Sequence, residues 1–316
     1  MIDNTFSLMN YIGKGGSSKV FLSKDRLGNK VVLKVIRQDK KYKREAAEDM
    51  LYREHSLLQK LQYHPNIIDS YGVNVNGVAT MEGENEEIMY SILEYAEHGS
   101  IANFVRYTGA IEERIVKFFM IQICNAMEFI HQQGYAHLDI KLENILLDSL
   151  FNIKIADMGA SINVEDTSGC TDKRRGTKYY MAPEVLHKTS GSMYSAFKAD
   201  IFSLGISLFV LLVGEFPNLE RLRDYSSTED SEKNSTLLPQ QEANLETLRK
   251  FKKLSPCLQD LIKSMTDIDP ENRPSVSEIL ENSWFSEDFS RECLEEVHSE
   301  MEARKEFMLK SSFKHN

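Results

Sequence analysis

The stretch that decides the fold lies at residues 136–146 and reads AHLDIKLENIL. It places a histidine, a carboxylate, a lysine and an asparagine directly ahead of the apolar run 145–147. A short apolar run bounded by polar residues is typical of a strand, so the polar residues are predicted to form a loop before it. Asp139 can orient a hydroxyl nucleophile, and Lys141 can neutralise charge on a transferred group. The stretch therefore indicates a catalytic loop.

A second polar loop follows the strand-like run 153–156 and begins with Asp157. Asp157 and Asn144 offer a carboxylate and an amide oxygen, which are ligands suited to Mg²⁺. Each of these residues taken alone reads as a turn former or a cap. Their joint order predicts a site in which Asp139 and Lys141 are catalytic, and in which Asn144 and Asp157 hold the metal.

The first part of the chain carries a glycine-rich turn and a predicted ion pair. The turn lies in IGKGGSSKV, residues 12–20, where backbone N–H groups can approach phosphates because glycine has no Cβ. Lys34 ends an apolar strand, where it would extend to solvent unless it has a partner. Glu54 shares a helical face with Leu51 and Leu58, so it is expected to pair with Lys34.

The order of predicted elements indicates an α+β fold with two lobes. Strand-like segments at 6–36, 67–75 and 88–95 surround one helix at 44–61, whereas the remainder is mostly helical. The predicted helices lie at 101–107, 112–133, 182–187, 198–213, 257–267 and 275–282. A polar and acidic insertion is expected at 224–246, and an amphipathic helix is expected in the tail after residue 286.

Composition excludes several classes of protein. The chain has 316 residues, 41% of them hydrophobic, and a formal net charge of −10, which does not suit a nucleic-acid-binding surface. The four widely spaced cysteines argue against a zinc site or a disulfide framework and fit a reducing compartment. Residues 201–213 are too few to span a bilayer, which needs about 20. The N-terminus lacks signal-peptide features, so an intracellular location, cytoplasmic or nuclear, is expected.

The motifs in this order resemble a eukaryotic protein kinase over about residues 6–286. The glycine loop of the family corresponds to GKGGSS, its strand lysine to the end of VVLK and its helix glutamate to Glu54. The catalytic loop corresponds to HLDIKLEN, the metal-binding loop to DMG and the Ala-Pro-Glu segment to Ala182–Glu184. Asp200 and Arg273 follow in the family order. The resemblance implies a bilobal kinase fold. Its small lobe would cover 6–93, its connector 94–99 and its large lobe 100–286, with a helical tail at 287–316.

The resemblance also implies ATP and Mg²⁺ as cofactors and assigns roles to individual positions. Lys34, steadied by Glu54, would contact the α and β phosphates, while Lys141 would bind the γ-phosphate. The other implied nucleotide-binding residues are Gly13, Gly15, Ser18, Val20, Val32, Leu93, Glu94, Ala96 and Leu146. Glu184 and Arg273 resemble the family's buried ion pair.

Lys141 together with Thr177 resembles the serine/threonine branch of the family, which implies protein substrates with Ser or Thr sites. Glu143 occupies a position that recognises arginine in some relatives, and the acidity of the chain agrees weakly with basic substrates.

One departure from the family pattern concerns control. Leu138 stands where the family has an arginine that pairs with a phosphate on the activation loop. Phosphorylation within 167–171 would therefore lack its usual partner, and we expect activity that does not depend on it. The cations of 173–175 could form a substitute anion site. A kinase-fold scaffold without activity is the alternative, but all four polar residues Lys34, Asp139, Asn144 and Asp157 are present.

Overall fold

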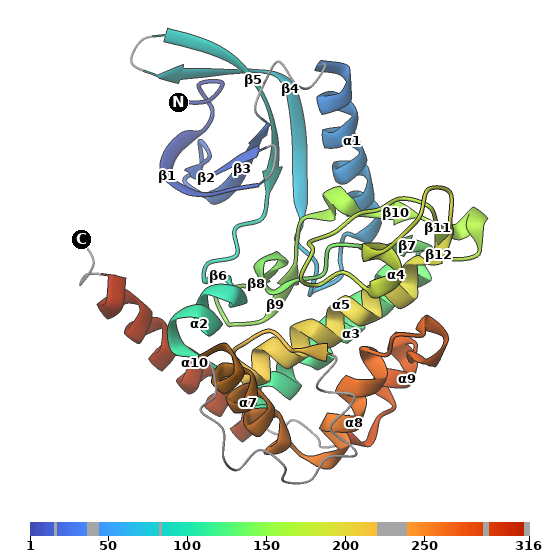
Figure 1. Cartoon of the computed structure of the whole chain (residues 1–316). Coiled ribbons are helices and arrows are strands. Elements are labelled where there is room, and N and C mark those ends of the chain that lie inside the picture. The colour runs from blue at the N-terminus through green and yellow to red at the C-terminus, as the bar shows by residue number, and fades with distance from the viewer. Residues whose placement is uncertain (16–17, 37–43, 82–83, 220–238, 287–290, 313–316) are drawn as a thin grey trace. The chain divides into compact units, whose positions relative to one another are not determined.

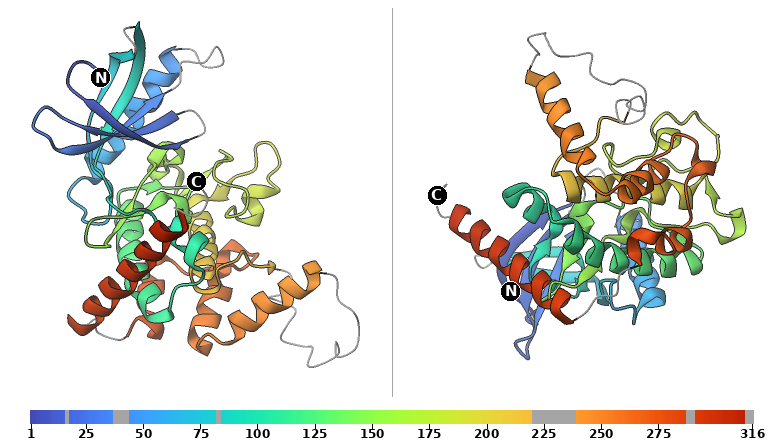
Figure 2. Two further views of the ribbon diagram at one scale, coloured as in Figure 1. Left: turned by 90° about the vertical axis from the view of Figure 1, so that its left-hand side faces the viewer. Right: turned by 90° about the horizontal axis from the view of Figure 1, so that it is seen from below.

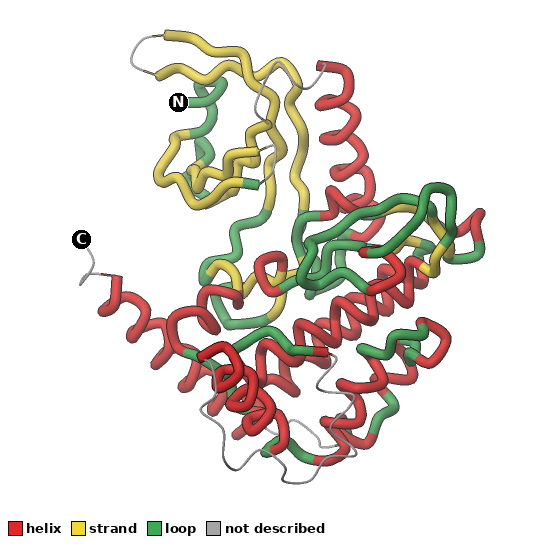
Figure 3. Tube along the Cα trace, in the orientation of Figure 1, coloured by secondary structure: helices red, strands yellow, loops and turns green. Residues whose placement is uncertain are grey.

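The computed structural model describes residues 1–15, 18–36, 44–81, 84–219, 239–286 and 291–312 (Figure 1). These residues form two compact units. The first contains Met1–His98 and Lys154–Gly159, and the second contains Gly99–Ile153 and Ala160–Asn316. Figure 3 shows that strands make up most of the first unit and helices most of the second. The predicted α+β fold class is confirmed.

A five-stranded antiparallel sheet forms the body of the first unit, in the order β1-β2-β3-β5-β4. Its strands are β1 (Ser7–Lys14), β2 (Ser18–Lys24), β3 (Lys30–Ile36), β4 (Ser70–Met81) and β5 (Glu84–Leu93). Helix α1 (Arg44–Leu61) packs against β4 and β5, as Figure 2 shows. Its residues Ala47 and Leu51 share a core cluster with Ile36 and Met89. The apolar spacing that predicted the helix therefore marks the side that is buried against the sheet.

Helices of the second unit surround α5, with a few short strand pairs beside them. The helices are α2 (Ile101–Thr108), α3 (Glu113–Gln132), α4 (Pro183–Leu186), α5 (Ala196–Val213), α7 (Pro239–Lys252), α8 (Pro256–Met265), α9 (Val276–Leu280) and α10 (Arg291–Ser312). The antiparallel pairs are β6 (Gly99–Ser100) with β8 (Ile145–Leu147), β7 (Tyr135–Ala136) with β10 (Ile162–Asn163), and β11 (Cys170–Thr171) with β12 (Tyr194–Ser195). Short 3₁₀ turns lie at Leu142–Asn144, Met158–Ala160, Glu165–Thr167, Pro270–Asn272 and Ser283–Phe285.

Helix α5 is the core helix of the second unit and packs against α3, α7 and α8. After Asp200 it carries no charged residue and is apolar on nearly all sides, a pattern that is typical of a buried helix. By length and composition alone it could cross a membrane, yet 89% of its apolar window is buried inside the protein. Gly205 is needed for this packing, because a Cβ there would lie 2.8 Å from Met265 Cβ and 2.8 Å from Thr266 Cγ2.

The structure differs from the predicted elements in two places. The β4–β5 hairpin extends to Met81 and Glu84, beyond the predicted strands 67–75 and 88–95, because its polar end gives no apolar alternation to follow. Part of the predicted insertion, 224–238, lies outside the described residues. The rest of the predicted insertion, 239–246, forms the start of helix α7, so this part is helical and not an irregular loop.

A buried ion pair ties α4 to the loop before α9. Arg273 donates from Nη1 to Glu184 Oε1 at 2.7 Å and from Nη2 to Glu184 Oε2 at 2.8 Å. Its remaining N–H groups donate to the carbonyls of Asp267, Lys198 and Ile268. All five donors of the guanidinium are therefore satisfied, which a fully buried cation requires.

Replacement of this buried arginine is expected to cost far more stability than replacement of an exposed one. Arg273→Leu leaves the partly buried Glu184 without its cation and the three carbonyls without their donor, so we expect the free energy of unfolding to fall by about 3–5 kcal/mol. The matched control is Arg53→Leu, which removes the exposed pair with Asp49 and is expected to cost less than about 1 kcal/mol. Chemical denaturation of both variants measures the two losses in the free energy of unfolding. Equal losses would show that the Glu184–Arg273 pair does not anchor the unit.

Candidate active site

The predicted partnership of Lys34 and Glu54 is present in the first unit. Lys34 lies in β3, and Glu54 lies on α1 between the buried residues Leu51 and Leu58. Lys34 Nζ donates to Glu54 Oε1 at 2.8 Å and to Oε2 at 2.9 Å. It also donates to Asp157 Oδ1 at 2.8 Å. The ammonium thus bridges two carboxylates that are far apart in sequence.

The electrostatics of this cluster keep Lys34 charged. Burial disfavours the ammonium, but the negative charges and hydrogen bonds of Glu54 and Asp157 outweigh it and raise the pKa of Lys34 above its usual range. A raised lysine pKa means that the stabilisation is present below the unfolded pKa of about 10.4 and is lost only as pH rises beyond it. Lys34 is therefore a permanent cation at neutral pH.

Asp157 lies two residues after the end of β9 (Ile153–Ile155) and directly before the 3₁₀ turn Met158–Ala160. Its φ of 62° lies in the left-handed region, which aspartate tolerates better than most residues. Its side chain is 43% exposed, so this carboxylate faces both Lys34 and solvent. The backbone of Gly159 lies close to the Asp157 carboxylate. A Cβ at position 159 would lie 3.3 Å from Asp157 Oδ1.

The catalytic-loop residues form one hydrogen-bonded network in the second unit. Lys141 Nζ donates to Asp139 Oδ2 at 2.6 Å and to Thr177 Oγ1 at 2.8 Å. Thr177 Oγ1 in turn donates to Asp139 Oδ1 at 2.7 Å. Asn144 Nδ2 donates to the carbonyl of Asp139 at 2.9 Å and to its Oδ2 at 3.2 Å. In the sequence Thr177 indicated only the branch of the family, and its bond to Asp139 is seen only in the structure.

A buried aspartate on α5 fixes the backbone of this loop. Asp200 is fully buried and accepts N–H bonds from His137 at 2.8 Å and from Leu138 at 2.7 Å. His131 Nε2 lies 3.0 Å from the same carboxylate. The sequence marked Asp200 as a family position, but nothing in it indicated His131 as a partner.

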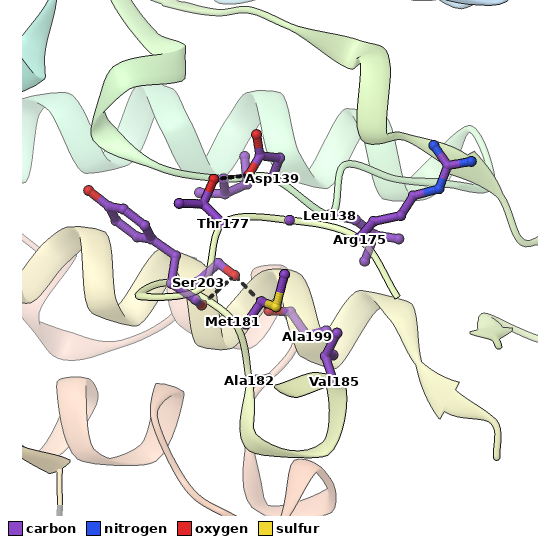
Figure 4. A pocket seen from close by; sticks show the side chains of 12 residues that line it. Leu138, Asp139, Arg175, Thr177, Met181, Ala182, Val185, Ala199 and Ser203 are labelled. Atoms are coloured by element: carbon purple, nitrogen blue, oxygen red, sulfur yellow. Dashed lines mark hydrogen bonds between the residues drawn. The ribbon is translucent and has the colours of Figure 1, made fainter. Parts of the chain in front are cut away.

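Leu138 is an apolar part of the loop. It is buried, and its φ of 60° is left-handed. Gly176 approaches it so closely that an added Cβ would lie 2.5 Å from the Leu138 carbonyl oxygen. A cavity of about 10 Å³ borders Leu138, which is room for about one water molecule. Figure 4 shows the guanidinium of Arg175 directed away from Met181 and Val185 in its lining.

The activation loop, residues 160–182, is tied to the rest of the second unit by main-chain contacts. Strand β10 pairs with β7, and β11 pairs with β12. Tyr194 donates from its hydroxyl to the Lys173 carbonyl at 2.6 Å, and the Ala196 N–H donates to the Gly169 carbonyl at 2.8 Å. Burial, followed by nearby carboxylates, raises the pKa of Tyr194 to about 12, so its hydroxyl remains a donor at neutral pH. None of these contacts requires a phosphate.

The remaining predicted nucleotide residues lie mainly in the first unit. Gly13 and Gly15 flank the end of β1, Ser18 and Val20 begin β2, Val32 lies in β3, Leu93 ends β5, and Glu94 and Ala96 follow it. Val32 is paired with Leu93. Leu146 lies in β8 of the second unit.

The side chain of Glu94 has a structural role that the sequence did not indicate. Its Oε1 lies 2.9 Å from Lys154 Nζ, and its Oε2 accepts the Asp69 N–H at 3.1 Å.

A family model described as protein kinase domain matches residues 6–285. CBL-interacting serine/threonine-protein kinase 15 of Arabidopsis thaliana is 31% identical over 92% of this chain and 63% of its own length. The carbon catabolite-derepressing protein kinase of Saccharomyces cerevisiae is 33% identical over 90% of this chain and 40% of its own. The chain belongs to the eukaryotic protein kinase family. It spans less than two thirds of the length of these relatives.

Substitution of Gly176 is expected to disturb the contact with Leu138. Gly176→Ala places a Cβ against the Leu138 carbonyl oxygen at a φ of 107°. The matched control is Gly191→Ala, which has a φ of 81° and nothing within 4 Å. The control is expected to lose about 1–2 kcal/mol from its left-handed backbone alone. Gly176→Ala is expected to lose a further ~1–3 kcal/mol from overpacking, measured by denaturant unfolding. Losses of the same size would contradict the close approach.

Proposed function

We propose that this chain is an ATP- and Mg²⁺-dependent serine/threonine protein kinase that transfers the γ-phosphate to Ser or Thr hydroxyls of protein substrates. The observation that carries the proposal is the pair of polar networks, Lys34–Glu54–Asp157 in one unit and Asp139–Lys141–Thr177 in the other. Transfer from ATP fits the expected intracellular location, since ATP is held inside cells.

The donor chemistry suits ATP and Mg²⁺. Within the described residues no three His, Cys, Asp or Glu side chains form a metal cluster. Mg²⁺ in phosphoryl-transfer sites is commonly held by one or two protein groups together with substrate phosphates, so a complete protein cage is not needed. Asp157 has a half-exposed carboxylate, and Asn144 donates both of its hydrogen bonds to Asp139 from its amide nitrogen. The Asn144 amide oxygen is then the atom suited to a cation.

The residues divide the chemistry between them. Bound Mg²⁺ would neutralise charge on the phosphate oxygens. Lys34 would bind phosphate oxygens, and Glu54 would hold its ammonium in place. Asp139 would orient the substrate hydroxyl and accept its proton as the new P–O bond forms and the bond to the leaving diphosphate breaks. Lys141 would stabilise charge on the transferred group.

The adenine ring is proposed to bind in the first unit, against the apolar side chains of the sheet. Val20 and Val32 would cover one face of the ring, with Leu93 beside it. The backbone of Glu94 and Ala96 would meet its polar edge, while the turn of Gly13, Gly15 and Ser18 would lie over the phosphates. Ser18 is buried, and Gly15 N–H donates to its carbonyl at 2.9 Å, which supports a tight turn at this point.

Protein substrates with Ser or Thr are supported by Thr177, whose hydroxyl joins the Asp139–Lys141 network. Of the two relatives, one is named a serine/threonine-protein kinase and the other a protein kinase. The exposed carboxylate of Glu143 and the net charge of −10 favour basic sequences around the target residue.

Activity is proposed not to depend on phosphorylation of the activation loop. Leu138 is a buried apolar residue, so its position holds no cation that needs a phosphate as its partner. The main-chain pairing of β10 and β11 supports an ordered loop in the unmodified protein.

The first test is phosphate transfer from radiolabelled ATP by phosphatase-treated protein. With Mg²⁺ and a mixed pool of basic Ser/Thr peptides, we expect transfer by the wild type. Asp139→Asn cannot accept the hydroxyl proton, so its rate is expected to fall by about 10²–10⁴-fold. Equal and negligible rates for both proteins would favour the scaffold alternative.

The second test replaces the loop hydroxyls. Thr167, Ser168 and Thr171 are changed together to alanine, and kcat/KM is compared with that of the wild type. We expect the triple variant to retain activity within about threefold, because strand pairing still holds the loop when the bonds of the Thr167 and Thr171 hydroxyls to the Cys170 carbonyl and the Lys173 N–H are lost. A loss of the size seen with Asp139→Asn would show that a loop phosphate is required. Mass spectrometry of both proteins before the assay is the control for residual phosphate.

A further inference from the structure

The tail helix α10 follows the last residue that the kinase family model matches, and it takes no part in the proposed phosphate transfer. It lies beside α2 in the second unit (Figure 1). Val297 and Met301 stand one turn apart on its inner side, and both are buried. Glu296 Oε2 accepts from Arg114 Nη1 of α3 at 2.5 Å. The helix is therefore attached to the unit by packing and by charge.

Arg304 of α10 holds the C-terminal end of α2. Its Nη1 donates to Thr108 Oγ1 at 2.6 Å, and its Nη2 donates to the Ala110 carbonyl at 3.0 Å. Its Nε donates to Glu300 on its own helix, and the Arg304 side chain is only 13% exposed. Carbonyl groups at the C-terminus of a helix carry partial negative charge and lack intrahelical donors, so a cation stabilises that end. Arg304 therefore ties α10 to α2.

A second attachment is made by Phe151, which lies in the turn after β8. Its side chain is fully buried, although its φ of 59° is left-handed and therefore costly for a bulky residue. The ring packs edge-on against Phe104 of α2 and against His298 of α10, with centroids 6.3 Å and 5.4 Å away. Lys305 Nζ of α10 lies 5.9 Å from the ring centroid. A residue keeps a costly conformation only where its surroundings fix it, and here α2 and α10 supply those surroundings.

The turn that carries Phe151 is fixed to the end of β8 by hydrogen bonds. Asp148 Oδ1 accepts the N–H groups of Leu150 and Asn152, each at 2.8 Å. The Phe151 N–H donates to the Asp148 carbonyl at 3.1 Å. Strand β8 begins directly after Asn144, so only this strand and this turn separate Asn144 from Phe151.

Helix α2 also supports Asn144. It contacts both strand β8 and the 3₁₀ turn that ends at Asn144. Strand β6, which directly precedes α2, pairs with β8 through Ser100 and Leu146. Helix α10 therefore supports Asn144 by two routes, through Arg304 and α2 and through Phe151 and β8.

From these contacts we infer that α10 positions Asn144 for a divalent cation, with Arg304 and His298 as its positioning residues. Asn144 is buried and donates from its amide nitrogen to Asp139, so the direction of its amide oxygen depends on the backbone of its turn. Groups that orient a metal ligand affect the affinity for the metal although they do not touch it. The inference rests on the proposed function, in which Asn144 is a ligand of Mg²⁺.

The Mg²⁺ dependence of nucleotide binding tests this role without phosphate transfer. Dissociation constants of a fluorescent ATP analogue are measured with the full chain in EDTA and in excess Mg²⁺, and their ratio is called the Mg²⁺ effect. Arg304→Gln is expected to lower the Mg²⁺ effect about three- to tenfold and to leave binding in EDTA unchanged. His298→Ala is expected to lower it about twofold.

The matched control is Lys310→Gln. It removes the same charge from α10 at a side chain that is 75% exposed and paired only within the helix, with Glu306. It is expected to leave the Mg²⁺ effect unchanged.

A double-mutant cycle shows whether Arg304 acts through Asn144. Asn144→Ala removes the amide oxygen, so this variant alone is expected to have a reduced Mg²⁺ effect. Adding Arg304→Gln to Asn144→Ala is expected to cause no further fall, whereas independent effects would multiply.

Hydrogen exchange tests the support of the turn without nucleotide. In Arg304→Gln the amides of 142–152 are expected to exchange about three- to tenfold faster than in the wild type, because local opening becomes easier. The amides of α5 report on global stability and are expected to be unchanged. If they also exchange faster, His298→Ala takes the place of Arg304→Gln in every measurement, since His298 is exposed and its replacement leaves the core intact.

Four results overturn the inference. They are a wild-type Mg²⁺ effect in Arg304→Gln, an equal fall in Lys310→Gln, a further fall when Arg304→Gln is added to Asn144→Ala, and unchanged exchange of 142–152. A wild type that binds the analogue neither in EDTA nor in Mg²⁺ contradicts the proposed function instead. The exchange measurement then still decides whether α10 holds the turn of Asn144.

Discussion

The hydrogen bonds of Asp200 are the interaction on which the second unit depends. A carboxylate buried without partners would cost several kcal/mol, so its place inside α5 requires strong donors. It obtains them from the main-chain N–H groups of His137 and Leu138, with His131 beside them. The same bonds hold Leu138 in its left-handed conformation and so direct the next residue, Asp139, into the polar network. The core helix and the candidate catalytic residue are therefore parts of one arrangement.

Leu138 places a buried apolar side chain at the position for which the resemblance implied an arginine. An arginine at this place would need an anion, whereas the leucine is buried against the end of the activation loop. Gly176 allows the loop backbone to approach the Leu138 carbonyl directly. Strand pairing at β10 and β11 holds the rest of the loop. Packing and main-chain hydrogen bonds thus hold the loop beside Leu138.

In the first unit, a cluster of ion pairs holds separate elements together. Lys34 joins a strand, a helix and the turn after β9 through two carboxylates. Because the cluster is partly buried, the attraction is less screened than at the surface, and the lysine stays protonated. Glu54 is the more deeply buried of the two acids, and Asp157 is the more exposed one. Glu54 is therefore suited to positioning the lysine, and Asp157 is suited to meeting a ligand.

The sequence by itself determined the α+β class, the core helix α5 and the pairing of Lys34 with Glu54. These follow from apolar periodicity and from the cost of a carboxylate on a buried face, which are local properties. Only the tertiary structure decided the bond of Thr177 to Asp139, the partners of Asp200, the salt bridge of Glu94 and the contacts of Arg304 with the end of α2. These contacts join residues far apart in the chain, and their distances depend on how strands and helices pack, which no spacing in the sequence records.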